Sequence, residues 1–272
     1  QLESIGKQTI PVDEVIIIDD GSSDSTVKIC RKFIETHDFV SWKIICNDKN
    51  HGFVHNFIHG AYLAKGDVIF FSDQDDVWVD DRVECFLKYF NSNKNILSLT
   101  TTFSRFSEDN RLLDSHVIHP NSKKNGLRKI SLRNFCHFCS YLGMAMAIRR
   151  SLLFKYDFIN FEKRISTHDI FFNYVAVINN GLYHLDKVLT KRRSYDSSTS
   201  NLNISQGIKR CNSKLHYKLL ADINLKMTFY EMHVAAPNCQ KYLKNNLKNE
   251  AKRLNYVVSN SIVDYKIGRA HV

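Results

Sequence analysis

The chain has 272 residues, of which 43% are hydrophobic and 12% aromatic, and its formal net charge is +10. This length supports a substantial core, and the composition excludes a disordered protein. No apolar run approaches the roughly 18 to 20 residues of a membrane-spanning helix. The seven cysteines are odd in number, which argues against a disulfide framework and for a reducing cytoplasm.

The N-terminal part alternates between strand and helix patterns. Short apolar runs at 14–19, 42–46 and 67–72 predict buried strands. One helix is expected after the turn DDGSSDST, and another over 50–66, where apolar residues recur at helical spacing. Strands and helices in this order predict a parallel sheet with helices on its faces.

Further strands are expected over 96–103, 141–149 and 182–189, and a helix over 168–181. The opening QLESIGKQTIP is typical of the end of a helix. We therefore expect an earlier strand, and most of that helix, to be missing from the N-terminus.

The positive charge is concentrated at the C-terminal end. Residues 187–272 contain 16 Lys and Arg against 5 Asp and Glu. The Lys-rich helical pattern predicts a basic helical extension over 204–266, and IGRAHV at 267–272 is expected to be a non-native tail. The extension is either a surface for anionic partners, such as phospholipid or a phosphorylated acceptor, or a solvated helical face.

Two acidic clusters directly follow predicted strands. They are DDG at 19–21 and SDQDD at 72–76. Ligands of open α/β sheets bind outside the carboxyl ends of the strands, so the clusters are expected to form one acidic cleft. Mg²⁺ or Mn²⁺ would offset this charge, because such a cation takes one or two carboxylates together with phosphate oxygens. The first cluster would alternatively accept hydrogen bonds from a base or a ribose.

Three separated motifs resemble those of the family 2 glycosyltransferases of the GT-A fold, and in particular a bacterial rhamnosyltransferase-like branch. They are IIIDDGSSDST, NHGFVHNFIHGAYLAKGDVIFFSDQDDVW and THDIFF. The resemblance covers roughly residues 1–200. It implies an α/β, Rossmann-like GT-A domain over 1–203, N-terminally truncated, with a mostly parallel twisted sheet flanked by helices and a C-terminal helical tail.

The resemblance also implies an activity. It is the inverting, metal-dependent transfer of a sugar from a UDP- or dTDP-linked donor, such as dTDP-rhamnose, to a glycan or lipid-linked acceptor in surface polysaccharide synthesis. No nucleic acid partner is implied. The expected location is the cytoplasm, with peripheral contact to the inner membrane face through the basic extension.

Roles for single residues follow from the same resemblance. Asp73 and Asp75 would hold Mg²⁺ or Mn²⁺, and Asp169 would be the catalytic base. Gly143 and Met144 match a turn that forms the floor of the acceptor site. The residues expected to bind the nucleotide sugar are Asp19, Asp20, Gly21, Gly52, Asn56, Asp73 and Arg193.

One position departs from the family pattern. The family often has a His two residues after the position of Arg193, where this chain has Tyr195. Tyr is a poor ligand for these cations, so either Arg193 would take over the electrostatic role of the His near the diphosphate, or this loop functions differently. A degenerate protein that binds nucleotide sugar without turnover is the alternative. A phosphoacceptor signalling domain also has paired acids at a strand end, but its other motifs do not match this chain.

Several motifs also have simpler interpretations. The acids at 19–20 and 73–76, and Asp169, would then only form turns or helix N-termini. His51, His55 and His59 recur at the four-residue spacing of metal ligands, but no acidic or Cys partner is near them in sequence, which favours a polar helix face. CHFC at 136–139 is a lone pair of cysteines, for which two core thiols are favoured over a zinc or redox site.

Overall fold

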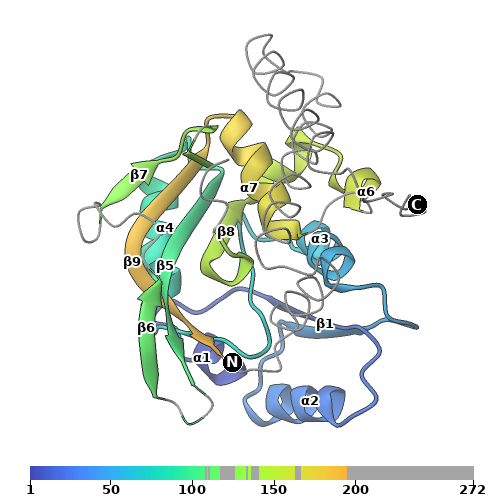
Figure 1. Cartoon of the computed structure of the whole chain (residues 1–272). Coiled ribbons are helices and arrows are strands. Elements are labelled where there is room, and N and C mark those ends of the chain that lie inside the picture. The colour runs from blue at the N-terminus through green and yellow to red at the C-terminus, as the bar shows by residue number, and fades with distance from the viewer. Residues whose placement is uncertain are drawn as a thin grey trace, which may run out of the picture. The chain divides into compact units, whose positions relative to one another are not determined.

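The computed structural model describes residues 1–107, 109, 111–116, 126–132, 134–135, 141–162 and 167–194 (Figure 1). Only the backbone is described at 114–116 and 161. The predicted basic extension, the tail, Tyr195 and the CHFC segment lie outside the described residues.

The N-terminal elements follow the predicted order closely. They are α1 (Leu2–Gly6), β1 (Val15–Asp19), α2 (Thr26–Thr36), β2 (Trp42–Cys46), α3 (Phe53–Leu63) and β3 (Val68–Phe70). The three strands match the predicted runs at 14–19, 42–46 and 67–72 to within a few residues. The helix expected over 50–66 is α3, and it ends before Gly66, because its C-cap residue is Ala64.

The remaining elements include several that the sequence patterns did not indicate. They are β4 (Val77–Trp78), α4 (Arg82–Ser92), β5 (Ser98–Phe106), β6 (Leu112–His116), β7 (Leu127–Lys129), η1 (Gly143–Ala145), β8 (Met146–Arg149), η2 (Arg150–Lys155), α6 (Phe158–Phe161), α7 (His168–Ile178) and β9 (Leu182–Arg193). The strand expected over 141–149 is only β8, because its first half forms the 3-10 turn η1.

The strands form two hydrogen-bonded groups. β1 and β2 pair in parallel, and a larger mixed sheet has the order β3-β8-β5-β9-β4, with β6 on β5 and β7 on β9. The prediction of an α/β fold is correct, but the prediction of a mostly parallel sheet is wrong for the larger group. There β5 and β9 are parallel, whereas β8 is antiparallel to both its neighbours and β4 is antiparallel to β9. A strand buried on both faces has the same apolar run in either direction, so its sequence does not reveal its direction.

Helices cover both faces of the larger sheet. Leu99 of β5 packs in a cluster with Phe86 and Phe90 of α4. The neighbouring Ser98 donates a 2.7 Å hydrogen bond to Asn173 of α7. Since successive side chains of a strand point to opposite faces, α4 and α7 lie on opposite sides of β5. Within the part of the chain that the structure describes, no helix is long and apolar enough to cross a bilayer.

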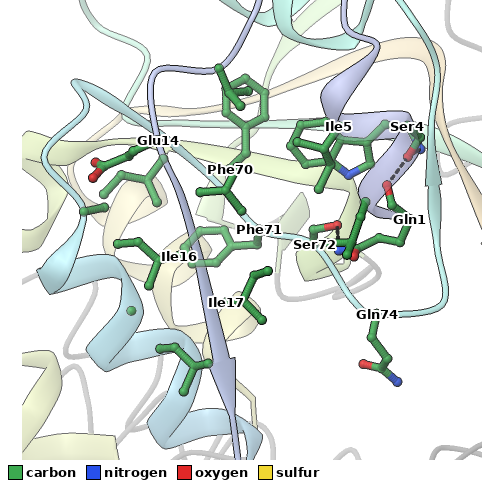
Figure 2. Close-up of a pocket in the computed structure, with 18 of the residues that line it drawn as sticks. Gln1, Ser4, Ile5, Glu14, Ile16, Ile17, Phe70, Phe71, Ser72 and Gln74 are labelled. Atoms are coloured by element: carbon green, nitrogen blue, oxygen red, sulfur yellow. Dashed lines mark hydrogen bonds between the residues drawn. The ribbon is translucent and has the colours of Figure 1, made fainter. Parts of the chain in front are cut away.

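A cavity of about 1770 Å³ has β1 and β3 among its walls (Figure 2). Ile16 and Ile17 of β1 line it together with Phe70 and Phe71, and Gln1 lies at its side, where its amide donates to Ser72 Oγ at 2.8 Å. Among the described strands, β1 pairs with β2 alone and β3 with β8 alone. The expectation of an additional N-terminal strand stays a prediction.

Candidate active site

The carboxylate of Asp20 is held at the end of β1 by three donors. It accepts hydrogen bonds from Asn47 Nδ2 (2.9 Å), His51 N (2.9 Å) and Gly52 N (2.8 Å). Asn47 also donates to Asn56 Oδ1 at 2.8 Å, which connects β2, the start of α3 and Asp20. Desolvation alone would raise the pKa of Asp20, but these hydrogen bonds outweigh it and lower the pKa to about 2. Asp20 is therefore a fixed anion at neutral pH.

Asp19 forms the turn that follows β1. It is buried, and its Oδ2 accepts hydrogen bonds from Gly21 N (3.2 Å) and Ser22 N (3.0 Å). Gly21 has a φ of +84°, which favours glycine. Thus Asp19 and Gly21 shape the loop that carries Asp20. Direct contact of Asp19 or Gly21 with a nucleotide stays a prediction.

Gly52 and Asn56 begin α3 beside Asp20. Gly52 is the N-cap residue and has a φ of +88°, and its amide is one of the donors to Asp20. This left-handed conformation aims the amides of His51 and Gly52 at the same carboxylate. The start of α3 is consequently built around a negative charge.

The second acidic cluster follows β3 and precedes β4. Burial, together with repulsion from Asp75 and Asp169, raises the pKa of Asp73 to about 6. Burial and the charges of Asp73 and Asp75 raise the pKa of Asp76 to about 7. Oδ2 of Asp76 is buried without a hydrogen-bond partner among the described residues. Asp73 and Asp76 therefore keep their protons to a higher pH than ordinary carboxyl groups.

The simpler interpretation of 73–76 as a helix N-terminus is wrong. These acids lead into the short strand β4, and the next helix, α4, begins only after its N-cap residue Asp81. Asp76 instead packs inside the sheet edge, where its Oδ1 accepts from Arg193 N at 3.2 Å.

Two arginines at the end of β9 have different surroundings. The charge of Arg192 lowers the pKa of both Asp73 and Asp76. The guanidinium of Arg193 lies 4.5 Å from the centre of the Phe106 ring. Adjacent residues of a strand point to opposite faces, so only one of the two faces the acids. The structure thus brings Arg192, which the sequence analysis did not single out, to the acidic cluster, whereas Arg193 reaches it through its backbone.

Asp169 lies in the first turn of α7 and is buried. Its Oδ2 accepts a 2.9 Å hydrogen bond from Gly143 N in η1, and its Oδ1 accepts from Ile170 N at 2.8 Å. Its charge raises the pKa of Asp73, so α7 and the loop after β3 contribute to one electrostatic group. Asp75 and Asp169 thus both act on Asp73, and the roles assigned to these three residues stay predictions.

The neighbouring His168 is enclosed by aromatic rings. Its ring centre lies 3.9 Å from that of Phe57 and 5.4 Å from that of Phe71. Neither ring nitrogen has a hydrogen-bond partner among the described residues. Desolvation lowers the pKa of His168 to about 4 although the charge of Asp169 opposes this shift, so the ring is neutral at pH 7.

The two acidic clusters approach the same cavity, the one of about 1770 Å³ that has β1 and β3 among its walls. Asp19 and Asp20 line it together with Ser72 and Gln74, the neighbours of Asp73 in sequence. A single cleft that contains both clusters stays a prediction, because the coupling between carboxylates involves Asp73, Asp75, Asp76 and Asp169.

The second cluster is chemically suited to a hard divalent cation. It offers carboxylate oxygens whose mutual repulsion raises two pKa values and a buried oxygen without a partner. Its acids do not form a close group of three ligands in the described part of the chain. This agrees with Mg²⁺ or Mn²⁺ chemistry, in which one or two carboxylates suffice when phosphate oxygens complete the shell.

A comparison with known protein families shows to which family the chain belongs. The profile described as "Glycosyl transferase family 2" matches residues 2–153, more than half of the chain. The chain belongs to glycosyl transferase family 2. Family membership and the GT-A fold therefore agree with what the three motifs implied.

Curated members of the family show similarity beyond this profile. The chain is 28% identical over 219 residues to the dTDP-rhamnosyl transferase RfbG of Shigella flexneri, covering 75% of this chain and 71% of that protein. It is 24% identical over 253 residues to the chondroitin synthase of Escherichia coli, covering 92% of this chain. The chain spans only 34% of the length of that synthase.

Solved glycosyltransferases share the fold. S. aureus TarS residues 1–349, in complex with UDP, superposes with a TM-score of 0.62 at 18% identity. The superposition covers 98% of this chain and 70% of the TarS chain. The mannosyltransferase PcManGT of Pyrobaculum calidifontis, in complex with GDP-Man and Mn²⁺, superposes with a TM-score of 0.55 at 15% identity, covering 96% and 81%. At these identities the similarity establishes the GT-A fold alone.

Proposed function

We propose that the chain transfers a sugar from a UDP- or dTDP-linked donor, such as dTDP-rhamnose, to a glycan or lipid-linked acceptor, with inversion and with the help of Mg²⁺ or Mn²⁺. The observation that carries this proposal is the electrostatic coupling of Asp73 to two other carboxylates, its neighbour Asp75 and Asp169 on α7. Carboxylates arranged in this way provide a cation site next to a carboxylate that can act as a base.

The Asp20 group is the proposed nucleoside site. Asp20 is anionic, and each carboxylate oxygen has two lone pairs, so it retains acceptor capacity for an N–H or O–H of the nucleoside. Gly52 and Asn56 would lie by the ribose and the diphosphate. The UDP complex of TarS and the dTDP-rhamnosyl activity named for RfbG support a pyrimidine nucleotide.

Asp75, with Asp73 beside it, is the proposed cation site. When bound, the cation would stabilise the negative charge that develops on the diphosphate leaving group. The Mn²⁺ in the PcManGT complex supports a divalent cation. Arg192 would add positive charge at the same place, since it already acts on Asp73 and Asp76.

Asp169 is the proposed catalytic base. Two backbone amides orient its carboxylate, and the remaining lone pairs can accept the proton of an acceptor hydroxyl. As Asp169 takes this proton, the acceptor oxygen forms a bond to the anomeric carbon and the bond to the diphosphate oxygen breaks. A single displacement of this kind inverts the anomeric configuration.

The proposal extends to the acceptor and the cellular location. One relative is named as a chondroitin synthase and another as a galactosyltransferase acting on a diphosphoundecaprenol-linked sugar, which favours a glycan or lipid-linked acceptor. The proposed location is the cytoplasm. The charge of residues 187–272 favours peripheral contact with the inner membrane face.

A turnover assay tests the proposal. The chain would be incubated with UDP- and dTDP-sugars, lipid-linked acceptors and Mn²⁺, and the anomeric configuration of the product would be read by NMR. We expect an inverted product, and a loss of ~10²–10⁴-fold in rate for Asp169→Asn with nucleotide binding unchanged. Full activity of Asp169→Asn would contradict the base assignment. Nucleotide binding without turnover of any donor would favour the non-catalytic alternative.

A further inference from the structure

A second group of metal-ligating side chains lies away from the acidic cluster. His55 and His59 are one turn apart on α3, and Glu162 follows α6, which contacts α3 (Figure 1). Their ligand atoms all lie within 4.8 Å of one another. Sequence spacing alone disfavoured a metal here because no acidic partner was near the histidines. The fold supplies that partner from a position more than 100 residues further along the chain.

From this geometry we infer that His55, His59 and Glu162 form a binding site for a borderline divalent cation, of which Zn²⁺ is the cellular example. Two imidazole nitrogens and one carboxylate oxygen are a ligand set typical of zinc sites that keep a fourth position for water. Mg²⁺ and Mn²⁺ prefer oxygen ligands, so this site and the aspartate cluster differ in metal preference.

The distances fit such a cation. His55 Nδ1 lies 3.1 Å from Glu162 Oε1, and His59 Nε2 lies 3.2 Å from Glu162 Oε2. Ligand atoms around a tetrahedral Zn²⁺ with bonds of about 2.1 Å are about 3.4 Å apart. The site therefore requires only small side-chain adjustments to accept the ion.

A buried orphan oxygen gives independent support. Glu162 Oε2 is inaccessible to solvent and has no hydrogen-bond partner among the described residues, although His59 Nε2 is near. A buried carboxylate oxygen without a hydrogen bond is unfavourable, and a metal ion would satisfy it. The histidines are partly exposed, with 27% and 38% of their side chains accessible, so an ion can enter from solvent.

His51 lies next to this group but belongs to another pair. Its ring stacks on that of His55 with 4.7 Å between the centres, and its Nε2 contacts Asp48 Oδ1 at 3.2 Å. It therefore provides a matched control. The bound ion would connect α6 to α3, whose first turn carries Gly52 and Asn56 beside Asp20.

Calorimetry tests the inference on the full chain, stripped with a chelator and titrated with ZnCl₂ in excess Mg²⁺ and without nucleotide. We expect zinc binding that is at least tenfold weaker in His59→Gln and in Glu162→Gln, and unchanged in His51→Gln. At the same zinc concentration, zinc should also raise the Tm of the unsubstituted chain and of His51→Gln more than that of the other two variants. Circular dichroism would verify that each variant is folded.

Two results would overturn the inference. One is the absence of zinc binding by the folded chain, and the other is equal binding by all the variants. If His59→Gln or Glu162→Gln fails to fold, X-ray absorption of the zinc-loaded unsubstituted chain decides. Two imidazoles and an oxygen donor are expected, whereas sulfur donors would assign the zinc to cysteines. Because no nucleotide is present, this outcome is independent of the proposed transferase activity.

Discussion

The backbone amide of Gly143 donates a 2.9 Å hydrogen bond to Oδ2 of Asp169. This contact joins the 3-10 turn η1 to the first turn of α7 and orients the proposed base. A Cβ atom at position 143 would lie 2.5 Å from His168 Nε2 and 3.5 Å from Asp169 Cβ. The site therefore needs glycine here because of close approach, not because of an unusual φ.

We expect Gly143→Ala to lower kcat more than tenfold and to destabilise the fold by about 1–3 kcal/mol. His168 is held by Phe57 and Phe71, so the new methyl group would push η1 away from Asp169 instead. Nucleotide affinity should be unchanged. Steady-state kinetics and urea unfolding check this. Gly66→Ala is the control, since its Cβ would meet only Val68 O at 3.5 Å. A normal kcat for Gly143→Ala would refute the positioning role of this contact.

His168 predicts a pH dependence of stability. Its pKa is about 4 in the fold and about 6.5 in the unfolded chain, so between these values the unfolded state binds more protons. Stability contributed by the neutral ring is present above pH 6.5 and is lost as the pH falls toward 4, by about 2 kcal/mol between pH 7 and pH 5.

The variant His168→Phe should remove this part of the pH dependence. A phenylalanine fits the aromatic surroundings and leaves no buried nitrogen without a partner. The free energy of unfolding, measured in urea at pH 7 and pH 5, should differ less in the variant than in the unsubstituted chain. His37→Gln, at the exposed C-cap position of α2, is the control. An identical pH dependence in His168→Phe would show that other groups cause it.

The hydrogen bonds to Asp20 predict a second pH effect. Because its pKa is lowered from 3.8 to about 2, its contribution to stability is present above about pH 4 and is lost as the pH falls through 2. Asp20→Asn should therefore be less stable at pH 7, with a difference that shrinks toward pH 2. Urea midpoints at several pH values measure this.

The control for Asp20 is Asp24→Asn. Asp24 is exposed, and its Oδ1 accepts a 2.9 Å hydrogen bond from Thr26 N within its own turn. We expect a smaller loss of stability and no effect on nucleotide binding. Equal midpoints for Asp20→Asn and the unsubstituted chain at pH 7 would exclude a structural role of the Asp20 group.

The two arginines at the end of β9 should differ in function. Arg192→Gln should weaken binding of a nucleoside diphosphate about tenfold, because this charge acts on Asp73 and Asp76. Arg193→Gln should have a smaller effect, because its guanidinium lies over Phe106. Fluorescence titration with UDP measures both variants side by side. The reverse ranking would support the prediction from the family motifs that Arg193 binds the nucleotide sugar.

The sequence predicted the local elements well where the signal is local. The runs at 14–19 and 42–46 became β1 and β2, and the carboxylates Asp20 and Asp73 follow strands as expected. What it missed depends on contacts between distant residues. The strand β4 has two residues and exists because Val77 and Trp78 pair with Lys191 and Thr190 of β9.

Parts of the candidate site were also missed because they depend on contacts between residues distant in sequence. Asn47, which connects Asp20 with Asn56, carries no motif, although its place at the end of β2 was a usable signal. The different surroundings of Arg192 and Arg193 follow from the register of β9 against β4 and β5. Glu162 became visible as a partner of His55 only through the packing of α6 on α3.

Calorimetric binding of UDP and dTDP, with and without Mn²⁺, is the decisive test of whether the acidic cluster around Asp75 is the donor site. Asp75→Ala would be compared with the unsubstituted chain and with Asp80→Ala, which removes an exposed carboxylate beyond β4. We expect binding that requires Mn²⁺ and is lost only in Asp75→Ala. Binding by folded protein that needs neither Mn²⁺ nor Asp75, or the absence of binding, would contradict the assignment of this acidic cluster as the donor site.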